Sequence, residues 1–191
     1  MLELKNITKN YGSKQALDHV SLTLENGIYG LLGPNGAGKS TLMNIITGNL
    51  KPSSGTVLWN EENVHDMGAV YRSLLGYAPQ QQGLYDTFTG IRFLSYMATL
   101  KGIPKKKHRD EIQRVLNYVN LTAKAYRPIG TYSGGMKQRL AIAQTILNSP
   151  EILIFDEPSA GLDPFEREQF KRIMVKLKET SIIIISTHIV S

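Results

Sequence analysis

The sequence lacks cysteine and has no long apolar run. Without cysteine the chain can form neither a disulfide nor a thiolate metal site. Its apolar runs, such as residues 152–155 and 182–185, have the length of a strand, whereas a helix that crosses a bilayer needs about 20 apolar residues. The first residues include an acid and lack a basic stretch followed by an apolar one, so no signal peptide is expected. These absences are compatible with a cytosolic protein.

The composition is that of a globular protein with one basic region. Of the 191 residues, 41% are hydrophobic and 20% are charged, which excludes a disordered or collagen-like chain and predicts one domain. The net charge is +6, and residues 101–127 carry eight basic and two acidic side chains, while the rest of the chain has 14 of each sign. A basic chain suggests nucleic acid or an anionic membrane as a partner, but here the excess is local.

Apolar periodicity and turn residues predict an α/β fold. Strands are expected at residues 2–7, 16–24, 28–32, 56–59, 151–155 and 181–186, and helices at residues 39–48 and 164–179. Helical spacing runs from Ile91 and again from Ile112, and a third helix is expected at residues 135–147. We therefore predict a core of residues 1–87 and 150–191 with a helical subdomain of residues 88–149 inserted into it.

A glycine-rich loop follows the strand expected at residues 28–32. Residues 33–40 match the pattern G-x-x-x-x-G-K-[ST]. Glycines let backbone N–H groups converge on phosphate oxygens, and the following helix N-terminus adds partial positive charge. Lys39 would hold the outer phosphates and the Ser40 hydroxyl would ligate Mg²⁺; the alternative is a glycine-rich turn before an ordinary helix. The residues expected to contact the nucleotide here are Gly33, Pro34, Asn35, Gly36, Ala37, Gly38, Lys39, Ser40 and Thr41.

Two carboxylates end the apolar strand expected at residues 151–155. Strand ends of a buried parallel sheet face the ligand in α/β proteins. Asp156 suits the Mg²⁺ shell, and Glu157 suits a group that orients an attacking water or accepts its proton. Acids often end strands for other reasons, so this interpretation depends on the phosphate loop being present as well.

A second helix start with glycines occurs at Ser133, Gly134 and Gly135. Such a start can bind an anion. One γ-phosphate does not need two helix ends, which indicates that this end serves a neighbouring subunit. The alternative is an ordinary capped helix, since serine is a good N-cap residue.

Together these motifs resemble the nucleotide-binding subunit of an ABC transporter, from the first strand to the last residue. The matching parts, in chain order, are Tyr11 (the aromatic that stacks on adenine), residues 33–40 (Walker A), Gln80 (Q-loop), residues 132–136 (signature), residues 152–157 (Walker B), residues 159–163 (D-loop) and His188 (switch histidine). The resemblance implies a P-loop NTPase core of ABC ATPase type, with an N-terminal antiparallel β subdomain and the inserted helical subdomain.

The resemblance also implies a mechanism. Two subunits, in a homodimer or a heterodimer with another ATPase subunit, would hold two ATP molecules head to tail, and Ser133 and Gly135 of one would meet the ATP of the other. Asp163 would join the two sites. Hydrolysis would power a separate integral-membrane permease at the cytoplasmic face of the cell membrane. The implied catalytic residues are Glu157, His188 and Gln80, and the implied Mg²⁺ ligands are Ser40, Gln80 and Asp156.

The sequence departs from the family pattern in three places. Tyr132 and Met136 stand where the signature most often has leucine and glutamine, and Gln80 is the first of three glutamines. The chain ends three residues after His188, so we expect it to be truncated at its C-terminus. Tyr11 could instead be a surface aromatic, Gln80 a loop amide and His188 a structural histidine.

Rival functions depend on what lies between the glutamine and the signature. A nucleic-acid ATPase of this superfamily would carry a long coiled coil there, and only 52 residues separate Gln80 from Ser133. No nucleic-acid partner is therefore expected, although a soluble, non-transport ABC ATPase acting on nucleic acid or ribosomes remains the alternative. The short helical insertion and the residues that follow Ser133 look more like those of exporters than of importers.

Three consecutive lysines, Lys105, Lys106 and Lys107, are expected to begin a helix. Cations oppose the helix dipole at that end, so a role other than helix stability is indicated. One interpretation is that the lysines form a solvated face without a binding role. The other is that they make peripheral contact with anionic lipid beside a permease.

Overall fold

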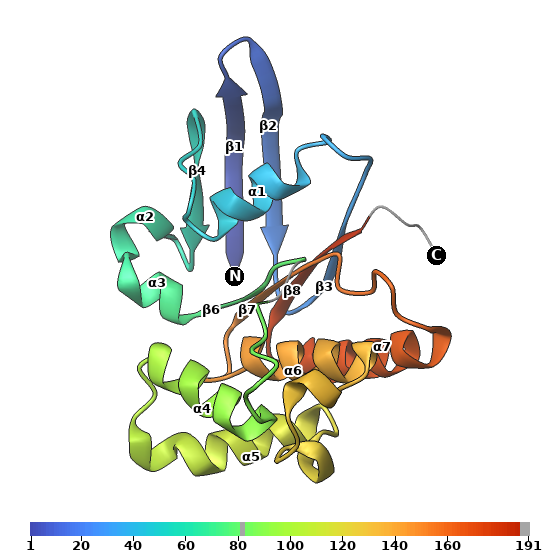
Figure 1. Ribbon diagram of the computed structural model, residues 1–191. Coiled ribbons are helices and arrows are strands. Elements are labelled where there is room, and N and C mark those ends of the chain that lie inside the picture. The colour runs from blue at the N-terminus through green and yellow to red at the C-terminus, as the bar shows by residue number, and fades with distance from the viewer. Residues whose placement is uncertain (81–82, 188–191) are drawn as a thin grey trace.

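The fold is built on two four-stranded sheets, one antiparallel and one parallel (Figure 1). The computed structural model describes residues 1–80 and 83–187. The antiparallel sheet has the order β2 (Lys14–Leu24), β1 (Leu2–Tyr11), β4 (Ser54–Trp59) and β5 (Glu62–Asn63). The parallel sheet has the order β3 (Gly27–Leu32), β8 (Ile182–Thr187), β7 (Ile152–Asp156) and β6 (Leu75–Ala78). The predicted α/β class, with an N-terminal antiparallel sheet, is confirmed.

Seven α-helices cover the described part of the chain. They are α1 (Lys39–Ile46), α2 (Val64–Met67), α3 (Ala69–Ser73), α4 (Gly90–Leu100), α5 (His108–Tyr118), α6 (Gly134–Thr145) and α7 (Pro164–Leu177). In Figure 1, α1 lies against the antiparallel sheet, and α6 and α7 lie below the parallel sheet with α4 and α5 beyond them. The parallel sheet is thus covered on both faces, as continuous apolar strands require.

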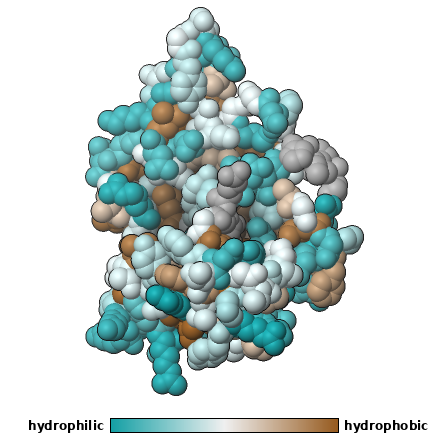
Figure 2. Space-filling model, in the orientation of Figure 1, coloured by the Kyte–Doolittle hydropathy of each residue, from teal (hydrophilic) through white to brown (hydrophobic). Residues whose placement is uncertain are grey.

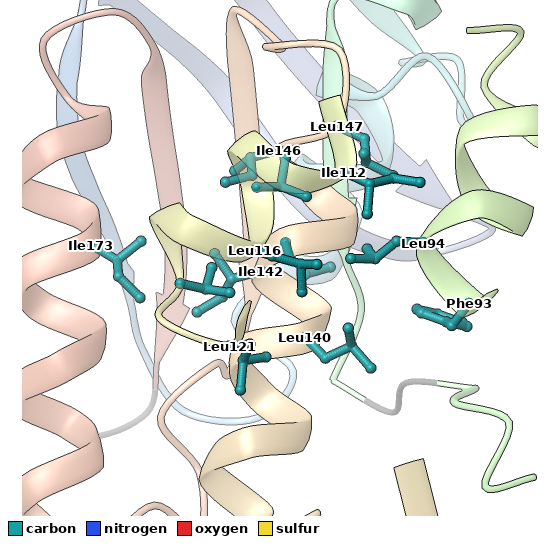
Figure 3. Packing of buried hydrophobic residues seen from close by; sticks show 14 of the residues in the cluster. Phe93, Leu94, Ile112, Leu116, Leu121, Leu140, Ile142, Ile146, Leu147 and Ile173 are labelled. Atoms are coloured by element: carbon teal, nitrogen blue, oxygen red, sulfur yellow. The ribbon is translucent and has the colours of Figure 1, made fainter. Parts of the chain in front are cut away.

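The parallel sheet separates two apolar cores because side chains alternate along each strand. Ile152 and Ile154 of β7 pack with β1 and α1. Leu153 and Phe155 point the other way, into a cluster with α4, α5, α6 and α7. Figure 3 shows part of this second cluster, with side chains from those helices directed toward one another. The helical segment therefore shares its core with the sheet, and its separation as a subdomain of residues 88–149 stays a prediction.

Some elements differ from the sequence-based expectation. The hairpin of β1 and β2 is longer than predicted, and β6 was not predicted, since it is short and contains Gly76. The three lysines form a 3-10 helix, Lys105–Lys107, that runs directly into α5, which begins at His108 and has Asp110 and Glu111 in its first turn. Acids suit that position because the helix dipole is positive there. The lysines are exposed, and lipid contact stays a prediction.

The surface is mainly hydrophilic on the face drawn in Figure 2, where hydrophobic residues form small separate groups. Within residues 1–80 and 83–187, no helix combines the length and the apolar character needed to span a bilayer.

Candidate functional site

A cavity of about 730 Å³ opens where three strands of the parallel sheet end. The loop after β3, Gln80 after β6, and the last residue of β7 all border it. The lining residues are Tyr11, Lys14, Ala16, Asn35, Gly36, Gly38, Lys39, Ser40, Thr41, Gln80, Asp156 and Glu157. The volume lies within the range of small-ligand sites, and the carboxyl edge of a parallel sheet is where such sites occur.

The loop before α1 has a backbone that only glycine accommodates. Gly38 is the N-cap of α1 with φ of 88°, and a Cβ there would lie 2.5 Å from the Ala16 carbonyl oxygen. The same residue has no side chain to cap the helix, and the first turn of α1 contains no acid. The N–H groups and the positive end of the α1 dipole therefore face the cavity without a competing anion from that turn, which favours a phosphate.

Lys39 is held at the mouth of this loop. Its Nζ donates hydrogen bonds to the carbonyl oxygens of Gly33 and Pro34, the latter at 3.2 Å. Gly33 and Pro34 thus position the ammonium group, although they do not line the cavity. Because an ammonium group binds a charged oxygen more strongly than a neutral carbonyl, a phosphate entering the loop can displace these contacts.

A buried serine organises the two carboxylates at the end of β7. Ser186 of β8 pairs with Asp156 in the parallel ladder and is fully buried. Its Oγ donates to Asp156 Oδ1 at 2.5 Å and accepts from the Glu157 N–H at 3.1 Å. One hydroxyl therefore fixes both the Asp156 carboxylate and the backbone of Glu157, which has an unusual φ of 50°.

Ser186 was not predicted as a site residue in its own right. The signal was its place at the end of an apolar run in the strand beside β7, but the register of β7 and β8 is needed to pair it with Asp156. The negative charge of Asp156 also reaches β6: burial, and secondarily Asp156, raise the pKa of Tyr77.

The residues predicted to ligate Mg²⁺ share the cavity. Ser40, Gln80 and Asp156 all line it and offer a hydroxyl, an amide and a carboxylate oxygen, which are the hard donors that Mg²⁺ prefers. In the described chain, no group of three or more histidine, cysteine, aspartate or glutamate side chains could hold a metal alone. This donor set fits an ion held jointly by a few protein oxygens and substrate phosphates.

Of the other predicted residues, Tyr11 borders the cavity and the rest lie apart from it or outside the described residues. Ser133 caps α6, accepting from the Met136 N–H at 3.2 Å, and neither it nor Gly135 borders the cavity. Asp163 caps α7 in the same way. Tyr11, half exposed, borders the cavity beside Lys14, which the sequence did not single out. His188 lies outside the described residues.

Comparison with known proteins gives one consistent family. A family model described as "ABC transporter" matches residues 17–160. An uncharacterised ABC transporter ATP-binding protein of Bacillus subtilis (strain 168) is 40% identical over 190 residues, 99% of this chain and 63% of that protein. The linearmycin resistance ATP-binding protein of the same organism is 37% identical, over 98% of this chain and 60% of that protein. The chain therefore spans somewhat more than half the length of these relatives.

A solved structure agrees with the sequence relatives. A dimeric bacterial ABC transporter cassette superimposes with a TM-score of 0.81 at 29% identity, over 99% of this chain and 88% of that one.

Proposed function

The chain belongs to the ABC transporter family, and on that premise we propose that it binds and hydrolyses ATP to drive a separate membrane permease. The observation that carries the proposal is the shared cavity: a phosphate loop, an amide and two carboxylates from distant parts of the chain meet at one edge of the parallel sheet. Neither a plain glycine turn nor a strand that merely ends in acids would bring these groups together.

Binding is assigned to the loop and its surroundings. The phosphates of ATP occupy the loop of residues 33–38, where backbone N–H groups, the α1 dipole and the Lys39 ammonium group supply positive charge. Tyr11, at the end of β1 and in the lining of the cavity, stacks on the adenine ring. Ser40, Asp156 and Gln80 hold Mg²⁺, which when bound neutralises charge on the phosphate oxygens.

Hydrolysis is assigned to Glu157. Its carboxylate orients and polarises a water for attack on the γ-phosphate, and the peptide group that carries it is fixed by Ser186. Gln80, on the same cavity, contacts this water or the ion. His188 is assigned to the γ-phosphate by resemblance alone.

A second subunit completes the site. Ser133 and Gly135 at the start of α6 both lie outside the cavity, and Ser133 is exposed, which supports the use of this helix start by the ATP of a neighbouring copy. The dimeric state of the similar cassette supports the association of two copies. Loss of the γ-phosphate removes what joins the two subunits, so the dimer reopens and passes this motion to the permease.

Export from the cytoplasmic face of the membrane is the direction we favour. The similar protein named for linearmycin resistance supports it, as does the short helical insertion. Nothing in the two relatives' names favours the nucleic-acid or ribosome alternative.

The test of this function uses the full-length protein. We expect phosphate release from ATP that requires Mg²⁺, together with co-purification of an integral-membrane protein from detergent-solubilised membranes. Absence of phosphate release would contradict the ATPase assignment. Release without any membrane partner would favour the soluble alternative.

Replacing Ser186 with alanine tests the support of the carboxylates. The change removes the hydroxyl that binds Asp156 and the Glu157 N–H, while the buried position accepts the smaller side chain. Loss of a hydrogen-bond partner of a metal ligand typically lowers metal affinity about 10- to 100-fold. We therefore expect the Mg²⁺ concentration for half-maximal hydrolysis to rise by about the same factor. Titration with Mg²⁺ measures it, and an unchanged midpoint would show that Ser186 has only a structural role. Ser73→Ala, at an exposed serine, is the control.

A further inference from the structure

The first turns of α6 and α7 are in direct contact through Gly135 and Glu166. A Cβ added to Gly135 would overlap the carboxylate group of Glu166. Gly135 is buried, and the Glu166 side chain is only 14% exposed. Glycine at this position therefore leaves room for a carboxylate from the neighbouring helix, independently of any contact with phosphate.

The carboxylate of Glu166 is paired with a cation on α6. Arg139 Nε lies 3.5 Å from Glu166 Oε2, and the arginine side chain is 17% exposed. The Nη1 of Arg139 also donates to the carbonyl oxygen of Asn120 at 3.2 Å, beyond the end of α5. Arg139 Nε makes no hydrogen bond in the described structure, so Glu166 is what balances the charge on that side of the guanidinium group. Removing one member of a mostly buried pair leaves the other uncompensated.

Glu166 is also tied to the segment before α7. Its N–H donates to the Asp163 Oδ1 at 2.8 Å, and Asp163 is the last residue of segment 159–163. Glu166 thus contacts two regions that the proposed dimer would use: segment 159–163 through its backbone, and the start of α6 through its side chain. By contrast, the Glu168–Arg172 pair lies within α7, with side chains 55% and 67% exposed.

We propose that Glu166 is a positioning residue that fixes the start of α6, with Ser133 and Gly135, relative to segment 159–163, so that both move as one unit when a second copy binds. This inference rests on the proposed function. Electrostatics predicts which of the two residues has the larger effect on the dimer. Arg139 neutralises a carboxylate beside the helix end that would meet the neighbouring ATP. Loss of Arg139 would leave the Glu166 carboxylate uncompensated near that helix end, which opposes the approach of a phosphate, whereas loss of the Glu166 charge would leave the Arg139 guanidinium group uncompensated, which does not.

The experiment measures ATP-dependent dimerisation of the full-length protein in a Glu157→Gln background. Glu166→Gln and Arg139→Gln are compared with Glu168→Gln, the same substitution in the exposed pair on the same helix. We expect both pair variants to weaken the dimer about 5- to 150-fold, the usual range of coupling between sites. Arg139→Gln should form the weaker dimer of the two. The ATP affinity of the monomer should stay within about twofold, because neither residue of the pair lines the cavity. Glu168→Gln should match the parent.

Each outcome bears on one claim. If Glu166→Gln dimerises like the parent, or loses dimerisation and monomer ATP affinity together as a misfolded variant would, the inference is overturned. If the parent itself forms no dimer with ATP, the dimer in the proposed function is overturned instead. Glu166→Asp keeps the charge and withdraws the carboxylate from Gly135, so this variant should fold and still weaken the dimer. If Glu166→Asp and Arg139→Gln, each tested as a single variant, both dimerise fully, the inference is also refuted.

Discussion

Replacing Glu157 with glutamine is expected to abolish ATP hydrolysis while ATP binding is retained. The amide has nearly the shape of the carboxylate but cannot accept a proton from water. General bases typically contribute about 10²- to 10⁴-fold to a rate, so phosphate release should fall by that factor. The backbone contacts of Glu157 with Ser186 do not depend on the side chain, which keeps the cavity intact.

The same variant should accumulate an ATP-bound dimer. If hydrolysis is what removes the phosphate that joins the subunits, blocking it leaves the dimer closed, and size-exclusion chromatography with and without ATP detects the change. Glu151→Gln is the matched control, since Glu151 is exposed directly before β7, at the end of the strand opposite to Glu157. Normal phosphate release by Glu157→Gln would refute the assignment of Glu157 as the base.

The parts of the site that sequence predicts are contiguous in the chain. The phosphate loop needs only a strand, a run of glycines and a helix in succession, and β3, residues 33–38 and α1 follow that order. Asp156 and Glu157 could be predicted for the same reason, because an uninterrupted apolar strand precedes them. In such local patterns the order and spacing of the residues along the chain already place the functional groups, so no tertiary contact has to be known.

Contacts between distant segments could not be predicted in this way. The hydrogen bond from Ser186 to Asp156 depends on the register of β7 and β8, and Lys14 reaches the cavity because β1 and β2 form a long hairpin. Gly135 reads as a phosphate contact in the sequence, yet its packing against Glu166 appears only when α6 and α7 are placed side by side. Such features arise from tertiary pairing, which no periodicity encodes.

The local basic excess has a partly structural explanation. Lys101 Nζ donates to the carbonyl oxygens of Thr145 and Leu147, both at 3.2 Å, and Arg114 Nη2 donates to that of Ile146. Cations at a helix C-terminus satisfy its last carbonyl groups and suit its dipole. Burial lowers the pKa of Lys101 to about 8, against the opposing effect of Glu111. Two of the eight basic residues therefore cap α6, whose other end carries the proposed contact with a second ATP.

Replacing Lys39 with alanine is expected to abolish measurable affinity for ATP. The side chain already lies at the loop, held by the Gly33 and Pro34 carbonyl groups, so it requires little rearrangement to bind a phosphate. A hydrogen bond to a charged group contributes about 1.5–3 kcal/mol, so the loss of one such bond lowers affinity roughly 10- to 150-fold. If Lys39 makes two such bonds to the phosphates, the two factors multiply. The loop backbone is unaffected, because its glycine conformations do not depend on the lysine.

Fluorescence titration of Lys39→Ala with ATP and with adenosine separates the phosphate role from adenine stacking. Affinity for ATP should fall far more than affinity for adenosine, since Lys39 acts on the phosphates whereas Tyr11 acts on the base. Lys171→Ala, an exposed lysine on α7, should bind both ligands normally. Equal losses for both ligands would indicate a collapsed loop, and retained ATP affinity would contradict phosphate binding at this loop, on which every step assigned to Glu157 depends.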